Sequence, residues 1–319
     1  MFSHCKDMRQ VLWLTLLFGF ALGCEVRSGS AQNPAAPQNA LALREKLAKL
    51  AEPANGKVGV AIVVAEGGDA VDLLGSKHFP MQSVYKLPIV MAVLARVDAG
   101  KLKLEQNVRI LPADLVPPNI HSPIRDHHPS GNFEMTIREL SRAAIVNSDG
   151  TASDVLLRLV KPRHVRKFLH TMGVKGIKVE NTEKEMALDN KVQYDNWVTP
   201  RAAVVLLRKL QAGEGLSPSS RDLLLSWMKE TKTGSQRIRG LLPKDVQVAD
   251  KTGSSGTDHG ITAATNDIGL IELPNGEHLA VAVFIRDSAA DGDVRDAVIA
   301  QIARAAWDWA ATPGATTAH

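Results

Sequence analysis

The stretch Ser83-Val84-Tyr85-Lys86-Leu87-Pro88-Ile89-Val90 decides the fold of this chain. It follows a loop at 77–82 and opens an apolar run that continues to Leu94, which is typical of a helix. We therefore expect the hydroxyl of Ser83 at the amino end of a helix. Lys86 lies one helical turn further on and should face the same way as Ser83.

Two further short motifs follow in order along the chain. Ser148-Asp149-Gly150 lies in the middle of the sequence, and Lys251-Thr252-Gly253 lies near its end. Lys251 closes an alternating stretch that includes Val246 and Val248, and another β-like run begins at Ile261. The third motif is therefore predicted on an edge-type strand that leads into a hairpin.

Each motif alone is common, and the chain contains three duplicates. These are Ser3-His4-Cys5-Lys6, Ser226-Trp227-Met228-Lys229 and Lys232-Thr233-Gly234. The first lies in a leader, the second falls late in an amphipathic helix, and the third sits in the loop after that helix. We interpret all three as coincidence.

Composition bounds the class of protein. A chain of 319 residues with 45% hydrophobic content can bury one large core or two intimate domains. The net charge of +4 could suggest nucleic acid, but the basic residues of 161–167 alternate with apolar ones and no aromatic stacking motif accompanies them. The ten histidines show no metal-ligand spacing. Neither a nucleic acid, a metal nor a cofactor is expected.

The amino terminus predicts export. Lys6 and Arg9 precede an uncharged run at 11–23 that is too short to span a bilayer comfortably, so residues 1–24 are interpreted as a signal peptide. Cys24 ends a segment that resembles a lipoprotein cleavage box, which leaves a lipid anchor at Cys24 and ordinary cleavage near 28–31 as alternatives. Both cysteines, Cys5 and Cys24, belong to this leader or its edge, so no disulfide is expected in the mature protein.

The order of elements predicts an α+β fold. After a flexible linker at 25–40 come a helix, two strands, many helices, three strands and a last helix. We expect a five-stranded antiparallel sheet flanked by helices, with an inserted all-helical subdomain. The catalytic domain then covers 41–312, its sheet part being 41–82 and 240–312 and its helical part 83–239, before a polar tail at 313–319.

The three motifs together supply the chemistry of serine acyl transfer. Ser83 would be the nucleophile and Lys86 would take its proton, with Lys251 as a nearby cation. The hydroxyl of Ser148 can relay a proton toward a departing nitrogen. Thr252 and Ser254 offer hydroxyls to a substrate carboxylate, and the backbone N–H groups of Ser83 and Ser254 could form an oxyanion hole.

Further segments give the chain a family resemblance. With the three motifs, the run Glu180–Met186 followed by Gln193-Tyr194-Asp195-Asn196-Trp197 resembles the Ω-loop region of class A β-lactamases, and the second run resembles their extended-spectrum, cephalosporin-hydrolysing subgroup. His121–Ile124 and Gly260–Asp267 extend the match, which covers about 45–311. The resemblance implies a secreted, periplasmic and monomeric enzyme that hydrolyses β-lactams and confers antibiotic resistance.

The resemblance also assigns residues. Glu183 matches the base that activates water for deacylation, and Glu185 is its rival. Arg237 corresponds to an arginine that in some members supports the Lys-Thr-Gly strand and the substrate carboxylate. Thr252, Gly253 and Ser254 would contact the substrate.

Three positions depart from the family pattern. Gly150 replaces an asparagine that contacts the substrate's acylamino side chain, and Ala187 replaces a residue that holds the hydrolytic water. His121 takes the place of an aromatic residue at the pocket rim. Acylation is therefore expected more firmly than turnover, which keeps open a D-alanyl-D-alanine peptidase, a penicillin-sensing acyl-binder or a non-enzymatic penicillin-binding module. Glu183 and the Ω-loop match favour hydrolysis.

Overall fold

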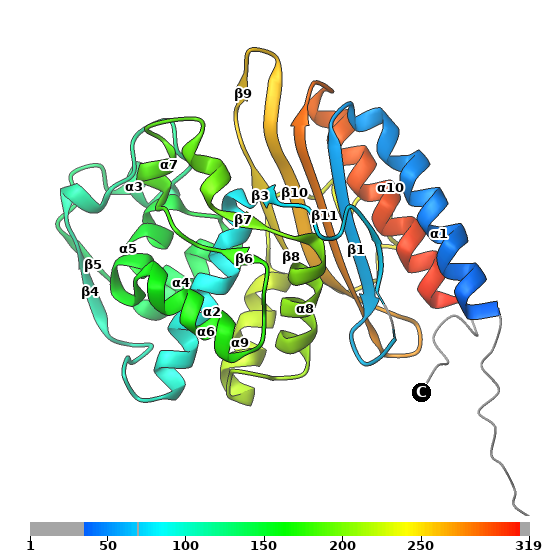
Figure 1. The fold of residues 1–319 in the computed structure, drawn as a ribbon. Coiled ribbons are helices and arrows are strands. Elements are labelled where there is room, and N and C mark those ends of the chain that lie inside the picture. The colour runs from blue at the N-terminus through cyan, green and yellow to red at the C-terminus, as the bar shows by residue number, and fades with distance from the viewer. Residues whose placement is uncertain (1–34, 69, 313–319) are drawn as a thin grey trace, which may run out of the picture. The chain divides into compact units, whose positions relative to one another are not determined.

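The computed structural model describes residues 35–68 and 70–312, and in this part of the chain a large antiparallel sheet carries helices on both faces (Figure 1). The strands of the sheet lie in the order β2-β1-β11-β10-β8, and β9 adds to β10 as a short sixth strand. Their bounds are β1 (Lys57–Val64), β2 (Val71–Leu73), β8 (Val248–Ser254), β9 (Thr257–Asp258), β10 (Ile261–Glu272) and β11 (His278–Ser288). The predicted α+β class and the five-stranded antiparallel path are confirmed.

The helices divide between the two faces of the sheet. The helices are α1 (Ala35–Ala51), α2 (Lys86–Asp98), α3 (Pro123–His127), α4 (Ile137–Val146), α5 (Gly150–Val160), α6 (Pro162–Thr171), α7 (Glu183–Met186), α8 (Pro200–Gln211), α9 (Pro218–Lys229) and α10 (Gly292–Ala311). Short 3-10 turns are η1 (Glu52–Ala54), η2 (Gln82–Tyr85), η3 (Pro112–Asp114) and η4 (Val192–Asp195). Helices α1 and α10 cover one face, and the helical region from α2 to α9 covers the other (Figure 1).

Alternation along β1 explains how one strand serves two cores. Val60 and Ile62 join the core beneath α1 and α10, whereas Ala61 and Val63 join the core shared with α2. Successive side chains of a strand point to opposite faces, so a strand covered on both faces needs apolar residues throughout. Helix α2 is similarly enclosed, because every residue from Lys86 to Leu94 is buried.

The structure corrects two predicted boundaries. Helix α1 begins at Ala35, inside the segment 25–40 predicted as a linker. Three alanines, at 35, 36 and 40, favour helix there, and Pro37 lies in the first turn, where proline is tolerated. The region 83–239 is also not all helical. It contains two small antiparallel strand pairs. Strand β4 (Asn107–Ile110) pairs with β5 (Phe133–Thr136), and β6 (Ile177–Lys178) pairs with β7 (Trp197–Val198). Strand β7 also pairs with β3 (Phe79–Pro80).

Other predictions concern the ends of the chain. The signal peptide at 1–24, the anchor at Cys24 and the polar tail at 313–319 lie outside the described residues. Within 35–68 and 70–312, no helix is both long and apolar enough to cross a membrane.

Candidate active site

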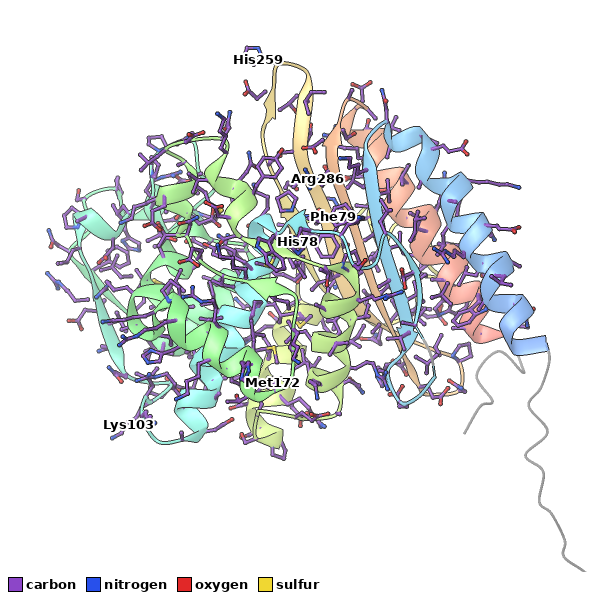
Figure 2. The ribbon with its side chains drawn as sticks, in the orientation of Figure 1. His78, Phe79, Lys103, Met172, His259 and Arg286 are labelled. Atoms are coloured by element: carbon purple, nitrogen blue, oxygen red, sulfur yellow. The ribbon has the colours of Figure 1, made fainter. Side chains whose placement is uncertain are left out.

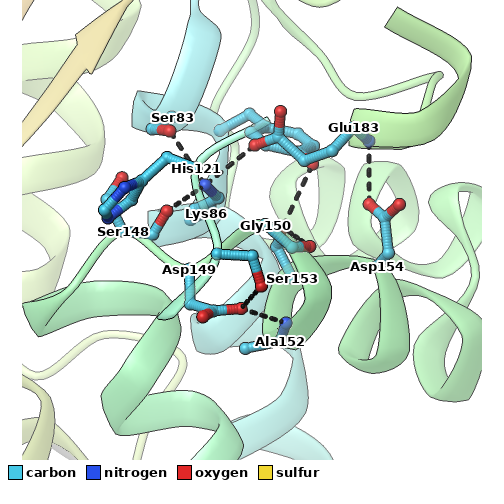
Figure 3. Close-up of polar contacts among 12 residues, drawn as sticks. Ser83, Lys86, His121, Ser148, Asp149, Gly150, Ala152, Ser153, Asp154 and Glu183 are labelled. Atoms are coloured by element: carbon cyan, nitrogen blue, oxygen red, sulfur yellow. Dashed lines mark hydrogen bonds and ion pairs between the residues drawn. The ribbon is translucent and has the colours of Figure 1, made fainter. Parts of the chain in front are cut away.

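Ser83 lies in η2, the turn that runs directly into the buried helix α2. Its Oγ accepts a hydrogen bond from Lys86 Nζ at 2.8 Å (Figure 3). The predicted one-turn spacing therefore does bring the two side chains together. Lys86 is only 1% exposed, so its ammonium depends on protein groups for its hydrogen bonds.

Lys86 Nζ has three partners in the protein. Besides Ser83 Oγ, it donates to the carbonyl oxygen of Ser148 at 2.7 Å and forms an ion pair with Glu183 Oε1 at 2.8 Å. An ammonium has three N–H donors, so this set uses all of them. The carboxylate balances a buried positive charge that would otherwise be costly.

Helix α7 decides between the two candidate glutamates. Glu185 accepts from the backbone N–H of Thr182 at 2.7 Å and completes a capping box on the exposed side of α7. Glu183, in contrast, is 5% exposed and directs its carboxylate to Lys86 (Figure 3). The geometry therefore brings Glu183, and not Glu185, to Lys86, which in turn contacts Ser83.

A second buried carboxylate lies behind Glu183. Asp154 on α5 accepts from the backbone N–H of Glu183 at 2.8 Å and from that of Lys184 at 3.2 Å, which ties the start of α7 to α5. Burial raises the pKa of Asp154 to about 7, even though those N–H groups favour its charged form. Nothing in the sequence marks this role except an aspartate in an apolar helix.

Lys251 lies on the other side of Ser148. Its Nζ is 3.0 Å from Ser148 Oγ and 3.0 Å from the carbonyl oxygen of Thr252. Burial, with the positive charge of Lys86, lowers the pKa of Lys251 to about 7, although Asp250 and Asp267 oppose that change. Ser148 thus touches one lysine through its carbonyl and the other through its hydroxyl.

Strand β8 approaches the nucleophile so closely that only glycine fits at position 253. A Cβ there would lie 2.5 Å from the carbonyl oxygen of Met81 and 3.2 Å from the backbone nitrogen of Ser83. The register pairs Gly253 with Asn266 on β10, whose amide donates to the carbonyl of Met81 at 3.1 Å. The Lys-Thr-Gly strand and the serine turn are therefore one packed unit.

Arg237 is 9% exposed and lies behind the same strand. Its guanidinium donates to the carbonyl oxygens of Gly253 at 3.3 Å and Asn266 at 3.0 Å and to Ser254 Oγ at 2.8 Å. Asp296 on α10 balances the charge at 2.8 Å. Arg237 thus contacts both β8 and the hydroxyl expected to meet a substrate carboxylate.

One motif interpreted as coincidence does contact the site. Thr233, from the duplicate Lys232-Thr233-Gly234, places its Oγ1 2.5 Å from Thr252 Oγ1. The sequence could not show this, because the contact joins a loop to a strand that follows it in the chain. The duplicate at Ser226 remains remote, since Ser226 only donates to the carbonyl of Leu223 within α9.

The three departing positions occupy different surroundings. A Cβ at Gly150 would lie 2.8 Å from Ile120 Cγ2 and 3.1 Å from the carbonyl oxygen of His121, so a larger residue requires Ile120 to move. His121 is exposed, and its Nε2 lies 3.0 Å from the carbonyl oxygen of Asn147. Ala187 ends α7 and presents no polar side-chain atom.

Comparison with known proteins identifies the family. The model of a family described as the β-lactamase enzyme family matches residues 42–310. This chain belongs to that family. The β-lactamase is 38% identical to β-lactamase VEB-1 of Pseudomonas aeruginosa over 83% of this chain and 89% of the relative, and 38% identical to the extended-spectrum β-lactamase PER-1 of the same organism over 84% and 87%.

Solved structures agree. The TLA-1 extended-spectrum β-lactamase is 40% identical to this β-lactamase, with a TM-score of 0.83 over 86% of this chain and 100% of that one. A β-lactamase from Chitinophaga pinensis is 44% identical, with a TM-score of 0.81 over 84% and 99%. The predicted class A serine β-lactamase is confirmed, and the comparisons favour hydrolysis of β-lactams over the peptidase and sensor alternatives.

Proposed function

We propose that Ser83 Oγ attacks the lactam carbonyl and that Glu183 later activates the water that releases the product. The observation that carries this proposal is that Lys86 Nζ lies 2.8 Å from both Ser83 Oγ and Glu183 Oε1. One buried lysine thus connects the nucleophile to the carboxylate needed for the second half of the reaction.

Acylation forms the Oγ–C bond and breaks the C–N bond of the lactam. The proton of Ser83 goes either to Lys86 in its neutral form, whose Nζ lies 2.8 Å from Ser83 Oγ, or to Glu183 through solvent. The leaving nitrogen takes a proton from Ser148, and Lys251, whose Nζ donates to Ser148 Oγ at 3.0 Å, returns a proton to that hydroxyl. Backbone N–H groups of Ser83 and Ser254 would polarise the carbonyl as charge develops on its oxygen.

The substrate carboxylate would bind along β8. Lys251 supplies a buried cation, Thr252 and Ser254 supply hydroxyls, and Arg237 orients Ser254 from behind at 2.8 Å. Thr233 supports the hydroxyl of Thr252 at 2.5 Å. This arrangement suits a planar carboxylate beside a strained amide, as in penicillins and cephalosporins.

Deacylation adds water to the acyl carbon and passes one proton of that water to Glu183. The bond to Ser83 Oγ then breaks, and Ser83 Oγ recovers a proton from Glu183 through Lys86. The names of PER-1 and TLA-1 record extended-spectrum activity for those relatives, and we propose cephalosporins as preferred substrates here. The absence of a polar side chain at Ala187 supports slower release of the acyl group than its formation.

We further propose that the enzyme is exported to the periplasm as a monomer. The basic residues and uncharged run of the leader support export, and Cys24 leaves lipidation as the alternative to free secretion. Replacing Cys24 by serine tests this point: unchanged partitioning between membrane and soluble fractions would contradict the anchor.

Turnover of a chromogenic cephalosporin, followed together with intact-protein mass, tests the mechanism. We expect sustained hydrolysis by the unmodified protein, no adduct on Ser83→Ala, and an accumulating acyl adduct on Glu183→Ala. Glu185→Ala is the matched control, because it removes a carboxylate from the same helix without touching Lys86. Undiminished turnover by Glu183→Ala would contradict the base assignment, and a single burst from the unmodified protein would indicate an acyl-binding sensor.

A further inference from the structure

A concavity lies on the sheet side of the molecule, and none of the residues around Ser83 lines it. It has a volume of about 470 Å³, and its walls come from β1, β11 and the segment that leads into β3. The lining residues that matter here are Lys57, Leu74, Lys77, His78, Phe79 and Arg286, and Figure 2 shows three of them, His78, Phe79 and Arg286, close together. We call this concavity the β1–β11 groove.

The floor of the groove is apolar and its edge is strained. Phe79 is 1% exposed and lies 6.0 Å, ring to ring, from Phe284, so the floor is fixed in the core. Leu74 is 39% exposed and has φ of +50°, in the left-handed region that leucine rarely adopts. Strained backbone positions are enriched at ligand-binding sites, which supports a role for Leu74 in binding.

The rim is positively charged. Lys57 and Lys77 are exposed and pair with no carboxylate among the residues that the structure describes. Arg286 is held in place, because it pairs with Asp287 at 2.9 Å and donates to the carbonyl of His78 at 3.0 Å. Three cations thus surround the groove and one of them is neutralised.

The acidic and aromatic side chains beside the groove already have partners in the protein. Asp287 also accepts from Tyr194 Oη at 2.6 Å, and Asp72 pairs with Arg201 at 2.7 Å. The ring of His78 is stacked on Trp197 with centroids 3.6 Å apart, so it forms a rigid wall. A ligand that enters would therefore meet an apolar floor and two unneutralised lysines.

We propose that the β1–β11 groove binds a small amphiphilic organic anion, of the class of aromatic sulfonates and carboxylates. Its rings lie against the exposed side chain of Leu74, above the buried Phe79, and its acidic group lies between Lys57 and Lys77. This pairing satisfies both properties of the groove, since an inorganic anion would leave the apolar floor unused and an uncharged ring would leave the lysines unpaired. The site is independent of the proposed hydrolytic mechanism.

Fluorescence titration of the purified protein with 8-anilinonaphthalene-1-sulfonate tests the proposal. We expect saturable binding at one site that weakens about tenfold or more in the Lys57→Glu/Lys77→Glu double variant. Lys103→Glu is the matched control for charge reversal, because Lys103 is exposed and lies in a different part of the molecule (Figure 2). It should bind the dye as the unmodified protein does.

Two further measurements keep the result interpretable. The Lys57→Met/Lys77→Met variant removes charge but keeps apolar stems, and it should weaken binding less than the glutamate pair. The uncharged dye N-phenyl-1-naphthylamine should bind the unmodified protein more weakly than the sulfonate. Equal binding of the sulfonate by the unmodified protein and both double variants, or equal binding of both dyes, would overturn the proposal; unchanged cephalosporin turnover in the variants verifies their folding.

Discussion

Ser148 connects the two lysines of the site through two different atoms. Its carbonyl oxygen accepts from Lys86 and its hydroxyl contacts Lys251. The residue has φ of +57°, which is unfavourable for a side chain other than glycine. The strained backbone is what turns the carbonyl and the hydroxyl toward separate partners.

This double role predicts a separation of activity from stability. Ser148→Ala and Ser148→Gly should both lower kcat, by about a hundredfold or more, because each loses the hydroxyl that hands on a proton. Ser148→Gly should be more stable than Ser148→Ala by about 1 kcal/mol, since glycine adopts positive φ freely. Paired steady-state kinetics and urea unfolding check this; equal unfolding free energies would show that the backbone is unstrained.

The lowered pKa of buried Lys251 predicts that kcat/KM falls at high pH. Because the pKa of Lys251 is lowered to about 7, its ammonium is present in the free enzyme below that pH and is lost above it. We expect kcat/KM, which reports the free enzyme, to fall as pH rises above about 7. In Lys251→Arg the cation persists, so the falling limb should move upward by about 2 units or more. A limb at the same pH in both proteins would assign it to another group.

At the scale of elements, α5 is the part that organises the site. Asp149 caps α5 by accepting from the backbone N–H of Ala152 at 2.8 Å, and it also accepts from Ser122 Oγ at 3.0 Å and the N–H of Ile124 at 2.8 Å. Further along, Asp154 holds α7. One helix therefore fixes the middle motif at its start and, from its second turn, the glutamate that we propose for deacylation.

The link between α5 and α7 predicts a pH dependence of stability. The pKa of Asp154 is about 7 in the folded protein and about 3.9 in an unfolded chain, so the folded state binds more protons between those values. Proton binding to Asp154 therefore stabilises the folded protein. This stabilisation is fully present below about pH 4 and is lost as pH rises through 7. The unmodified protein should lose on the order of 2 kcal/mol between pH 5 and pH 8 relative to Asp154→Asn, which has no such titration.

Urea unfolding of both proteins at the two pH values measures this difference. Asp154→Asn should also be less stable at pH 5, because an amide has one oxygen to serve the N–H groups of Glu183 and Lys184. Parallel pH profiles for the two proteins would contradict a raised pKa for Asp154.

Much of the candidate site was predictable because its residues occur in short motifs, and the spacing within such a motif determines which side chains meet. Ser83 and Lys86 are one helical turn apart, and a helical turn brings them into contact. The choice between Glu183 and Glu185 was left to the resemblance, and the fold resolves it by using Glu185 as a cap. Thr233 and Asp154 were not predictable, because their contacts depend on how distant segments pack.

The missing asparagine at position 150 illustrates the same limit. Sequence alone shows only that Gly150 departs from the family pattern, whereas the structure shows Ile120 Cγ2 within 2.8 Å of where a Cβ would be. The two residues are therefore coupled. The small strand pairs β4–β5 and β6–β7 were missed for a similar reason, since strands of two to four residues carry little periodicity.

At the scale of the whole molecule, the sheet meets the helical region with little space between them. Gly59 of β1 pairs with Phe284 of β11, and its missing side chain makes room for the ring of Phe79 and for Pro200 of α8. A Cβ there would lie 2.3 Å from a ring carbon of Phe79 and 2.8 Å from Pro200 Cγ. The close packing of the two layers depends on this glycine.

Gly59→Ala should therefore lower the free energy of unfolding by about 1–3 kcal/mol or more, because Phe79 or Pro200 must shift in a filled core. Gly67→Ala is the matched control, since no atom lies within 4 Å of a Cβ at that turn. Urea unfolding should show the loss only for Gly59→Ala. Similar unfolding midpoints for the two variants would contradict the tight packing of the layers around Gly59.

The pairing of β1 with β11 determines when the sheet can form during synthesis. Lys57–Val64 hydrogen-bonds along its length to a strand made more than two hundred residues later, and β11 is also the partner of β10. A growing polypeptide that has not reached His278 therefore lacks the central strand that joins β1 to β10. Contacts so distant along the chain form slowly, so the sheet should stay open in the newly made enzyme until β11 has been synthesised.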